Sequence, residues 1–103
     1  MNYQFQKEDL DKYLVLSKNH VWRMIDDEAF VLAEDGRRLH SLNKVGSFIW
    51  KSADGHHTIR AIVEKICERF EVDKETAERD ASEFIAKLID EGIVNLSENP
   101  IES

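Results

Sequence analysis

Three short strand-like runs open the central part of the chain. They are Val21–Ile25, Ala29–Ala33 and Arg37–Leu42. A polar turn over residues 26–28 separates the first two, and Asp35-Gly36 before the third is a strong hairpin signal, because glycine takes a positive φ without steric cost. The continuous apolar middle run is typical of a strand covered on both sides, and the alternating third run of a half-exposed one. The pattern predicts a meander with residues 37–42 at its edge.

Three amphipathic helices are predicted to follow, each with a capping residue. The caps are Asn43 before Lys44–Ser52, Thr58 before a helix reaching Phe70, and Asp73 before a helix that stops near Gly92. Apolar residues of the second helix recur at i, i+3, i+4 and i+7, which forms one continuous stripe. We therefore predict an α+β, winged-helix-like fold, a three-stranded antiparallel β-meander followed by three α-helices.

The ends of the chain are expected to lie outside this unit. We place an N-terminal extension at residues 1–20, the domain at residues 21–96 and a frayed tail at residues 97–103. A chain of 103 residues suits one domain of this size. The apolar residues of the extension indicate either packing on the domain or a sister subunit, or a docking arm for a larger partner.

Charge and cysteine content narrow the function classes. The formal net charge is −7, which opposes both nonspecific nucleic-acid binding and binding to anionic membranes. Cys67 is the single cysteine, so an internal disulfide framework is excluded and a reducing compartment is favoured. The chain has neither a long apolar run nor a signal-peptide pattern at its start, so we expect a cytoplasmic protein with a protein or peptide partner.

No residue pattern predicts catalysis, a metal or a cofactor. Two of the four histidines, His56 and His57, are adjacent in an expected turn, where neighbouring side chains cannot easily converge on one ion. Cys67 occupies an inward position of the second helix, which favours a buried, inert thiol. Glycine-rich phosphate loops and nucleophile motifs are missing from the sequence. We expect a protein that is not an enzyme.

A DNA-binding winged helix is the structural rival, with the third helix as its reading element. Residues 74–91 carry three basic and six acidic side chains. A helix with that balance would repel the phosphate backbone that it has to approach. The remaining alternative is a winged-helix protein-interaction or transcription-regulatory module.

The edge strand suggests that the domain binds a peptide rather than DNA. Its unpaired N–H and C=O groups must be covered or used, and an extended peptide can add to such an edge as one more strand. The same edge could pair two copies of the chain, which predicts a homodimer.

Several short motifs, in order and at compatible spacing, carry a family resemblance. They are Val21-Trp22-Arg23-Met24, Leu42-Asn43-x-x-Gly46-Ser47-x-Ile49-Trp50, Asp54-Gly55-x-x-Thr58, Glu78-Arg79-Asp80, Phe84-Ile85, Leu88 and Glu91-Gly92. Over residues 20–95 the chain resembles the PqqD family, whose members assist pyrroloquinoline quinone biosynthesis and related peptide modifications. The resemblance implies a recognition element that binds the leader segment of a ribosomal precursor peptide. It would present that precursor to a modifying enzyme, often a radical S-adenosylmethionine (SAM) protein.

The resemblance also implies where a leader would bind: beside the third strand and against the third helix. The expected peptide-binding residues are Arg37, Arg38, Leu39, His40, Ser41, Leu42, Asp80, Glu83, Phe84 and Lys87. The backbone of the strand would supply hydrogen bonds, and Phe84 would form the floor of a groove. Asp80, Glu83 and Lys87 would form a charged rim that selects among leaders. Two alternatives to a binding role stay open. Phe84 is then a plain core residue, and Arg38 and His40 only keep an exposed edge soluble.

Overall fold

Two small antiparallel sheets and three α-helices make up the described part of the chain. The computed structural model describes residues 3–17, 21–32 and 39–101. The strands are β1 (Tyr13–Leu16), β2 (Trp22–Ile25), β3 (Glu28–Leu32), β4 (Leu39–Ser41), β5 (Asp54–Thr58) and β6 (Val94–Ser97). The helices are the 3-10 helix η1 (Lys7–Asp11) and the α-helices α1 (Lys44–Lys51), α2 (Ile59–Phe70) and α3 (Lys74–Asp90).

The predicted meander is confirmed as the sheet β2-β3-β4, with β3 in the middle. Asp26 and Asp27 have φ angles of 50° and 66°, the two positive values that a type I′ hairpin turn requires. The second predicted turn, at Asp35-Gly36, lies outside the described residues. The expectation that both faces of the middle strand are covered is wrong. Val31 is buried whereas its neighbour Phe30 is only half-buried, because the helices pack on a single face of this sheet.

All three predicted helix caps are present. The side chain of Asn43 accepts a hydrogen bond from the Gly46 amide, and Thr58 and Asp73 do the same for the amides three residues ahead of them. The apolar stripe of α2 is buried at Ile59, Ile62, Val63 and Ile66. None of the described helices has the length and apolar character that crossing a membrane would require.

A second sheet, β5-β1-β6, was not predicted from the sequence. In it β1 is the middle strand, and the register pairs Tyr13 with both Thr58 and Ser97. His56 and His57 therefore lie on a strand, and the expectation that they sit in a turn is wrong. The pairing with β1 extends this segment although its own side chains do not alternate. The boundary expected at residue 97 also falls inside β6, and the Ile101 amide donates to the carbonyl of Gly55.

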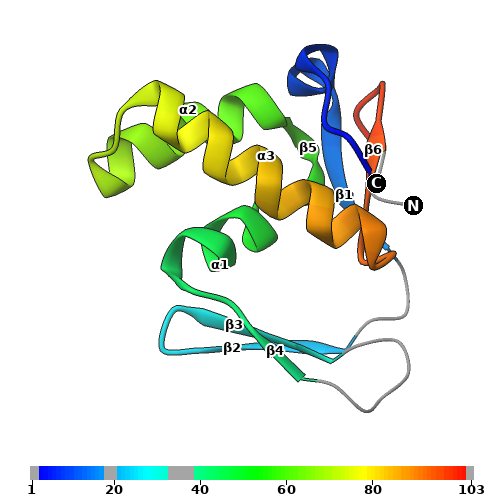
Figure 1. Cartoon of the computed structure of the whole chain (residues 1–103). Helices are drawn as coiled ribbons and strands as arrows, with labels where there is room; N and C mark the ends of the chain where they lie inside the picture. The colour runs from blue at the N-terminus through cyan, green and yellow to red at the C-terminus, as the bar shows by residue number, and fades with distance from the viewer. Residues whose placement is uncertain (1–2, 18–20, 33–38, 102–103) are drawn as a thin grey trace.

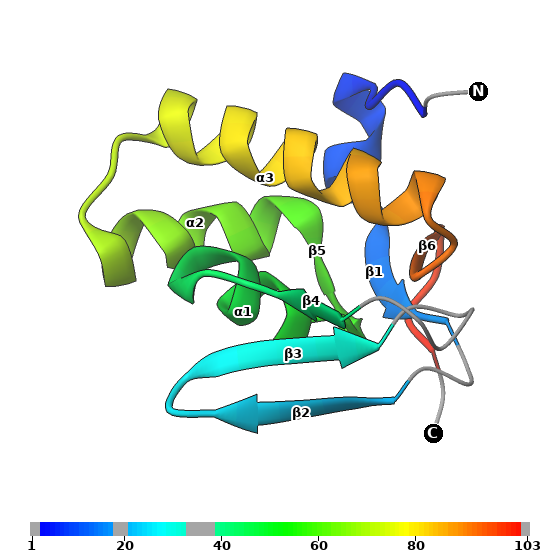
Figure 2. The same ribbon diagram turned by 60° about the horizontal axis from the view of Figure 1, so that its bottom comes forward.

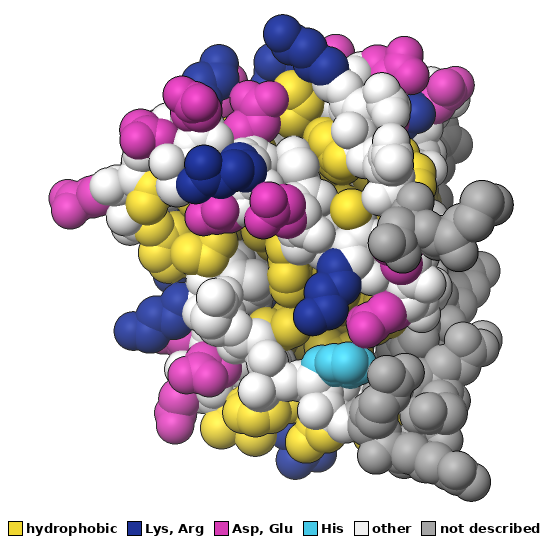
Figure 3. Space-filling view, in the orientation of Figure 1, with side chains coloured by type: hydrophobic (Ala, Val, Ile, Leu, Met, Phe, Trp, Pro, Cys, Tyr) yellow, Lys and Arg dark blue, Asp and Glu magenta, His cyan; other side chains and the backbone are white. Residues whose placement is uncertain are grey.

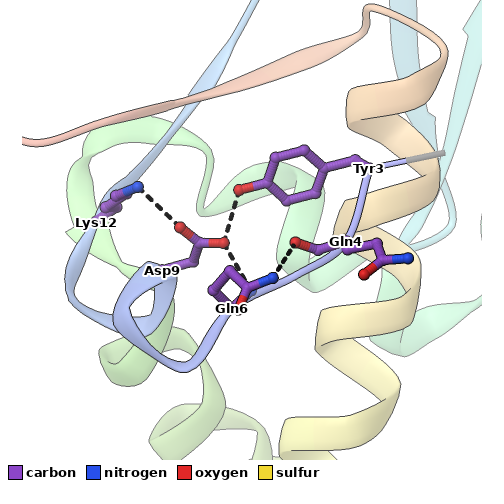
Figure 4. A network of polar contacts seen from close by, with 5 residues as sticks. All are labelled: Tyr3, Gln4, Gln6, Asp9 and Lys12. Atoms are coloured by element: carbon purple, nitrogen blue, oxygen red, sulfur yellow. Dashed lines mark hydrogen bonds and ion pairs between the residues drawn. The ribbon is translucent and has the colours of Figure 1, made fainter. Parts of the chain in front are cut away.

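A buried carboxylate organises the N-terminal segment internally (Figure 4). Asp9 is 1% exposed and accepts hydrogen bonds from the Tyr3 hydroxyl at 2.6 Å and the Gln6 amide at 2.9 Å. The Lys12 ammonium lies 2.8 Å from its other oxygen. Burial opposes ionisation of Asp9, but the hydrogen bonds from Lys12, Tyr3 and Gln6 outweigh it and hold its pKa below the usual value. Residues 3–17 pack on the domain through β1, which pairs with β5 and β6, and through the Ile59 amide, which donates to the Lys12 carbonyl.

Helix α1 lies between the meander and the antiparallel pair α2 and α3 (Figures 1 and 2). Its Trp50 is 1% exposed and meets the ring of Trp22 edge-on, with centroids 5.7 Å apart. The core continues through α2 and α3 to Leu14 and Val94 of the second sheet. In this arrangement β4 is an edge strand of the meander, and the C-terminal end of α3 approaches it at His40 and Glu91.

Candidate functional site

The outer edge of β4 presents unpaired backbone groups. The Leu42 amide donates to the carbonyl of Ala29 at 2.9 Å, and His40 faces Val31 in the ladder. Since the groups of successive residues alternate sides in an antiparallel strand, the N–H and C=O of His40 point toward β3. Those of Leu39 and Ser41 point the other way. No strand of the described part pairs with that side, so two donors and two acceptors are open there.

A groove lies between α1 and α3, and it begins at Asn43, two residues after the end of β4. Its lining from α3 consists of Asp80, Glu83, Phe84 and Lys87. Its lining from the start of α1 consists of Asn43, Val45, Gly46 and Ile49. The groove has a volume of about 370 Å³ and is open along its length. In Figure 3 hydrophobic side chains show between charged ones in the region of α3 and β4, which gives the hollow an apolar base and a charged rim.

The Phe84 ring is seated against the backbone of α1. A Cβ added to Gly46 would stand 3.2 Å from the Phe84 Cζ atom and 3.1 Å from the capping oxygen of Asn43. Only a residue without a side chain lets the ring approach this closely. The close neighbour of Gly46 across the α1–α3 contact is thus an aromatic side chain. Phe84 is half-buried, so part of its ring remains available to a ligand.

The buried Ser47 side chain joins α1 to the residues around β4, and His40 of β4 approaches the end of α3. Ser47 of α1 is buried, and its hydroxyl accepts from the Ala29 amide at 2.7 Å and donates to the Leu42 carbonyl at 3.1 Å. At the far end of α3, the Glu91 carboxylate lies 3.9 Å from the Nε2 atom of His40. That distance is too long for a hydrogen bond, and it becomes an ion pair only when the imidazole is protonated.

The predicted site residues take different positions in this arrangement. Arg37 and Arg38 lie outside the described residues. Leu39 is 64% exposed on the outer face of the meander, whereas Leu42 is 9% exposed and belongs to the core. The four predicted residues of α3 line the groove together. The α1 residues of the groove and Glu91 were not predicted as site residues, although the i, i+4 spacing of Val45 and Ile49 puts them on one face of their helix.

The remaining candidate chemistry stays apart from this groove. His57 Nδ1 lies 2.9 Å from Asp54 within β5, and Cys67 is half-buried on α2. In the part of the chain that the structure describes, no three His, Cys, Asp or Glu side chains gather in a way that would hold a metal ion. The groove offers shape and charge, and the edge of β4 offers backbone hydrogen bonds.

Comparisons with known proteins agree with this geometry. The family model described as Coenzyme PQQ synthesis protein D (PqqD) matches residues 28–94. The solved structure of TbiB1 in complex with the TbiA(beta) leader peptide is similar with a TM-score of 0.71 and 31% sequence identity, over 79% of this chain and 94% of that one. No curated protein matches the chain. The matched residues cover β3, β4, α1, β5, α2, α3 and the start of β6, which is more than half of the chain, so the chain belongs to the PqqD family.

Proposed function

We propose that this protein binds the leader segment of a ribosomally made precursor peptide by adding it as a strand to β4. The observation that carries the proposal is the open edge of β4 together with a groove that begins two residues further along the chain, at Asn43, and has an apolar base. Backbone bonds to Leu39 and Ser41 would set the position of the leader irrespective of its sequence. Side chains entering the groove beside Phe84 would select among leaders. The family membership and the similarity to a leader-peptide complex support leader binding as the function.

The expected affinity follows from these parts. Four backbone hydrogen bonds at about 1 kcal/mol each and one Leu-sized side chain at about 2 kcal/mol sum to about 6 kcal/mol. That corresponds to a dissociation constant on the order of 10–100 μM before any contribution from residues 33–38 or from the charged rim. Weak, reversible binding suits a carrier that has to release its cargo.

The protein acts in this proposal as a peptide chaperone without chemistry of its own. It would hold the leader while the core segment of the precursor reaches a modifying enzyme, for which we propose a radical SAM protein. The charge of α3 argues against the rival regulatory role. Glu75, Asp80 and Glu83 are exposed on it, where they would face a DNA backbone.

The test is a fluorescence-polarisation titration of the protein with leader peptides from precursors encoded beside its gene. Ser41→Pro removes one outward donor and places its ring where the leader strand would lie. Ser41→Ala is the matched control, because the exposed side chain changes while the amide stays. We expect a loss of tenfold or more in affinity for the proline variant and less than twofold for alanine. A proline at His40 is the poorer probe, since its amide points into the meander.

Two results would count against the proposal. Equal affinity of the Ser41→Pro and Ser41→Ala variants would place the leader elsewhere. Flat titrations with every leader, in a protein that remains folded by circular dichroism, would refute leader binding and leave only the description of the fold standing. Pairing of two copies through β4 would compete with the leader. We therefore expect any dimer seen in size-exclusion chromatography to dissociate when leader is added.

A further inference from the structure

A second hollow lies on the opposite side of α1 from the groove. It is bounded by α1, the end of α2 and the β2–β3 turn, which lie along one side of the molecule in Figures 1 and 2. Its volume is about 390 Å³, similar to that of the groove. From α1 it takes Lys44, Phe48 and Lys51, one helical face at i, i+4 and i+7 spacing. The groove uses the other face of the same helix, through Val45 and Ile49.

The charge of this hollow is opposite to that of the whole chain. Lys44, Lys51 and Arg69 line it together with His57, and Asp27 is its one acidic lining residue. The protein as a whole carries 14 Lys and Arg residues against 21 Asp and Glu. Among the residues that the structure describes, no carboxylate lies within 4.0 Å of the charged nitrogens of these three cations. Three unneutralised cations thus surround one concave surface.

Aromatic rings form the wall beneath Arg69. Its guanidinium carbon lies 5.6 Å from the centroid of the Phe48 ring and 5.9 Å from that of Phe70. The two rings meet edge-on with centroids 6.1 Å apart. A guanidinium held over aromatic rings keeps its in-plane N–H donors for a planar acceptor such as a carboxylate. The hollow therefore offers a fixed bidentate donor, two mobile ammonium groups and an apolar wall.

We propose that this hollow binds a short acidic segment of a partner protein, with carboxylates on Lys44, Lys51 and Arg69 and an apolar side chain against Phe48 and Phe70. A long polyanion such as nucleic acid fits less well, because the acidic remainder of the surface repels it. Since α1 separates the hollow from the groove, both can be occupied at once. A carrier that delivers a peptide to an enzyme needs such a second contact, but the hollow itself does not depend on leader binding.

The probe is a short fluorescein-labelled peptide of alternating Glu and Phe residues, with a matched peptide in which Gln replaces every Glu. We expect saturable, salt-sensitive binding of the Glu peptide alone, with shifts in ¹H–¹⁵N spectra of the protein confined to α1, the end of α2, the β2–β3 turn and the neighbourhood of His57. Lys51→Glu combined with Arg69→Glu should weaken binding about tenfold or more, because two attractions become repulsions. Lys7→Glu, an exposed reversal on η1 that changes the net charge by as much as either substitution does alone, should alter it less than twofold.

Several results would overturn the inference. Equal binding of the Gln peptide would show that carboxylates are not recognised. Weakening by Lys7→Glu as large as that of the double variant would show that net charge, and not this hollow, determines binding. Spectral shifts spread over the surface of the wild-type protein would contradict a defined site, and this readout needs no variant to fold. A thymidine oligonucleotide that binds more tightly, with the same dependence on Lys51 and Arg69, would assign the hollow to nucleic acid instead.

Discussion

Gly46→Ala probes the contact between α1 and α3 on which the groove depends. Two effects on stability oppose each other. Alanine in place of a helical glycine stabilises by up to about 1 kcal/mol through backbone entropy. The new methyl group, however, would meet Phe84 Cζ at 3.2 Å and the Asn43 oxygen at 3.1 Å, and overpacking of this kind costs about 1–3 kcal/mol. We expect a net destabilisation of about 1 kcal/mol in urea unfolding.

The effect on binding follows from where the ring can go. Phe84 is half-buried between α1 and the groove, so a ring displaced from Gly46 moves into the space proposed for the leader. We expect Gly46→Ala to weaken leader binding about fivefold to tenfold in the polarisation titration. Adding Phe84→Leu removes the clashing ring atom, and the double variant should recover stability relative to Gly46→Ala. A Gly46→Ala protein that is more stable than wild type and binds leader normally would refute this view of the groove.

Other substitutions test the parts that support the site. Ser47→Ala leaves the buried amide of Ala29 and the carbonyl of Leu42 without their partner, so we expect a loss of about 2 kcal/mol in urea unfolding and weaker leader binding. Asp9→Asn should cost about 2 kcal/mol at neutral pH. Because the pKa of Asp9 is lowered in the folded protein, its stabilisation is present above the unfolded pKa of about 4 and is lost as the pH falls below that value. Urea unfolding at several pH values should therefore show a free energy of unfolding that depends less on pH in Asp9→Asn than in wild type below about pH 4. Lys87→Glu should weaken binding of an acidic leader several-fold at low salt and little at 1 M salt; a change that is insensitive to salt would remove Lys87 from the rim.

The helices and the meander could be predicted because their signals are local. Asn43, Thr58 and Asp73 each cap a helix through a bond to an amide three residues ahead, a spacing that is visible in the sequence. The turn at Asp26-Asp27 likewise joins neighbouring strands. Short-range patterns of this kind determine each element and the pairing of adjacent strands.

The second sheet could not be predicted because its pairings join distant segments. The residues that pair with Tyr13 are 45 and 84 positions away, at Thr58 and Ser97. The Asp54–Thr58 segment has no alternation of apolar and polar residues, and Tyr13 and Leu14 follow Leu10 at a spacing that suits a helix. Strand formation here depends on tertiary pairing, which overrides the local pattern.

The candidate site was predicted only in part, because some of its features are local in the sequence and others depend on tertiary packing. The edge position of residues 39–41 follows from the order of the strands, and the charged residues of α3 follow from helical spacing. The contribution of α1 depends on the crossing of α1 and α3, which Gly46 permits and no local pattern specifies. Which amides of β4 face outward likewise follows only from the observed register with β3.

The most direct test of strand addition is amide hydrogen exchange measured residue by residue, with and without a leader peptide. The Leu39 and Ser41 amides point away from β3 and should exchange rapidly in the free protein, then become protected when the leader binds. The His40 amide faces Val31 and should be protected in both states. This alternation within three consecutive residues is the result that strand addition on β4 predicts. Unchanged exchange at Leu39 and Ser41 under saturating leader would contradict it.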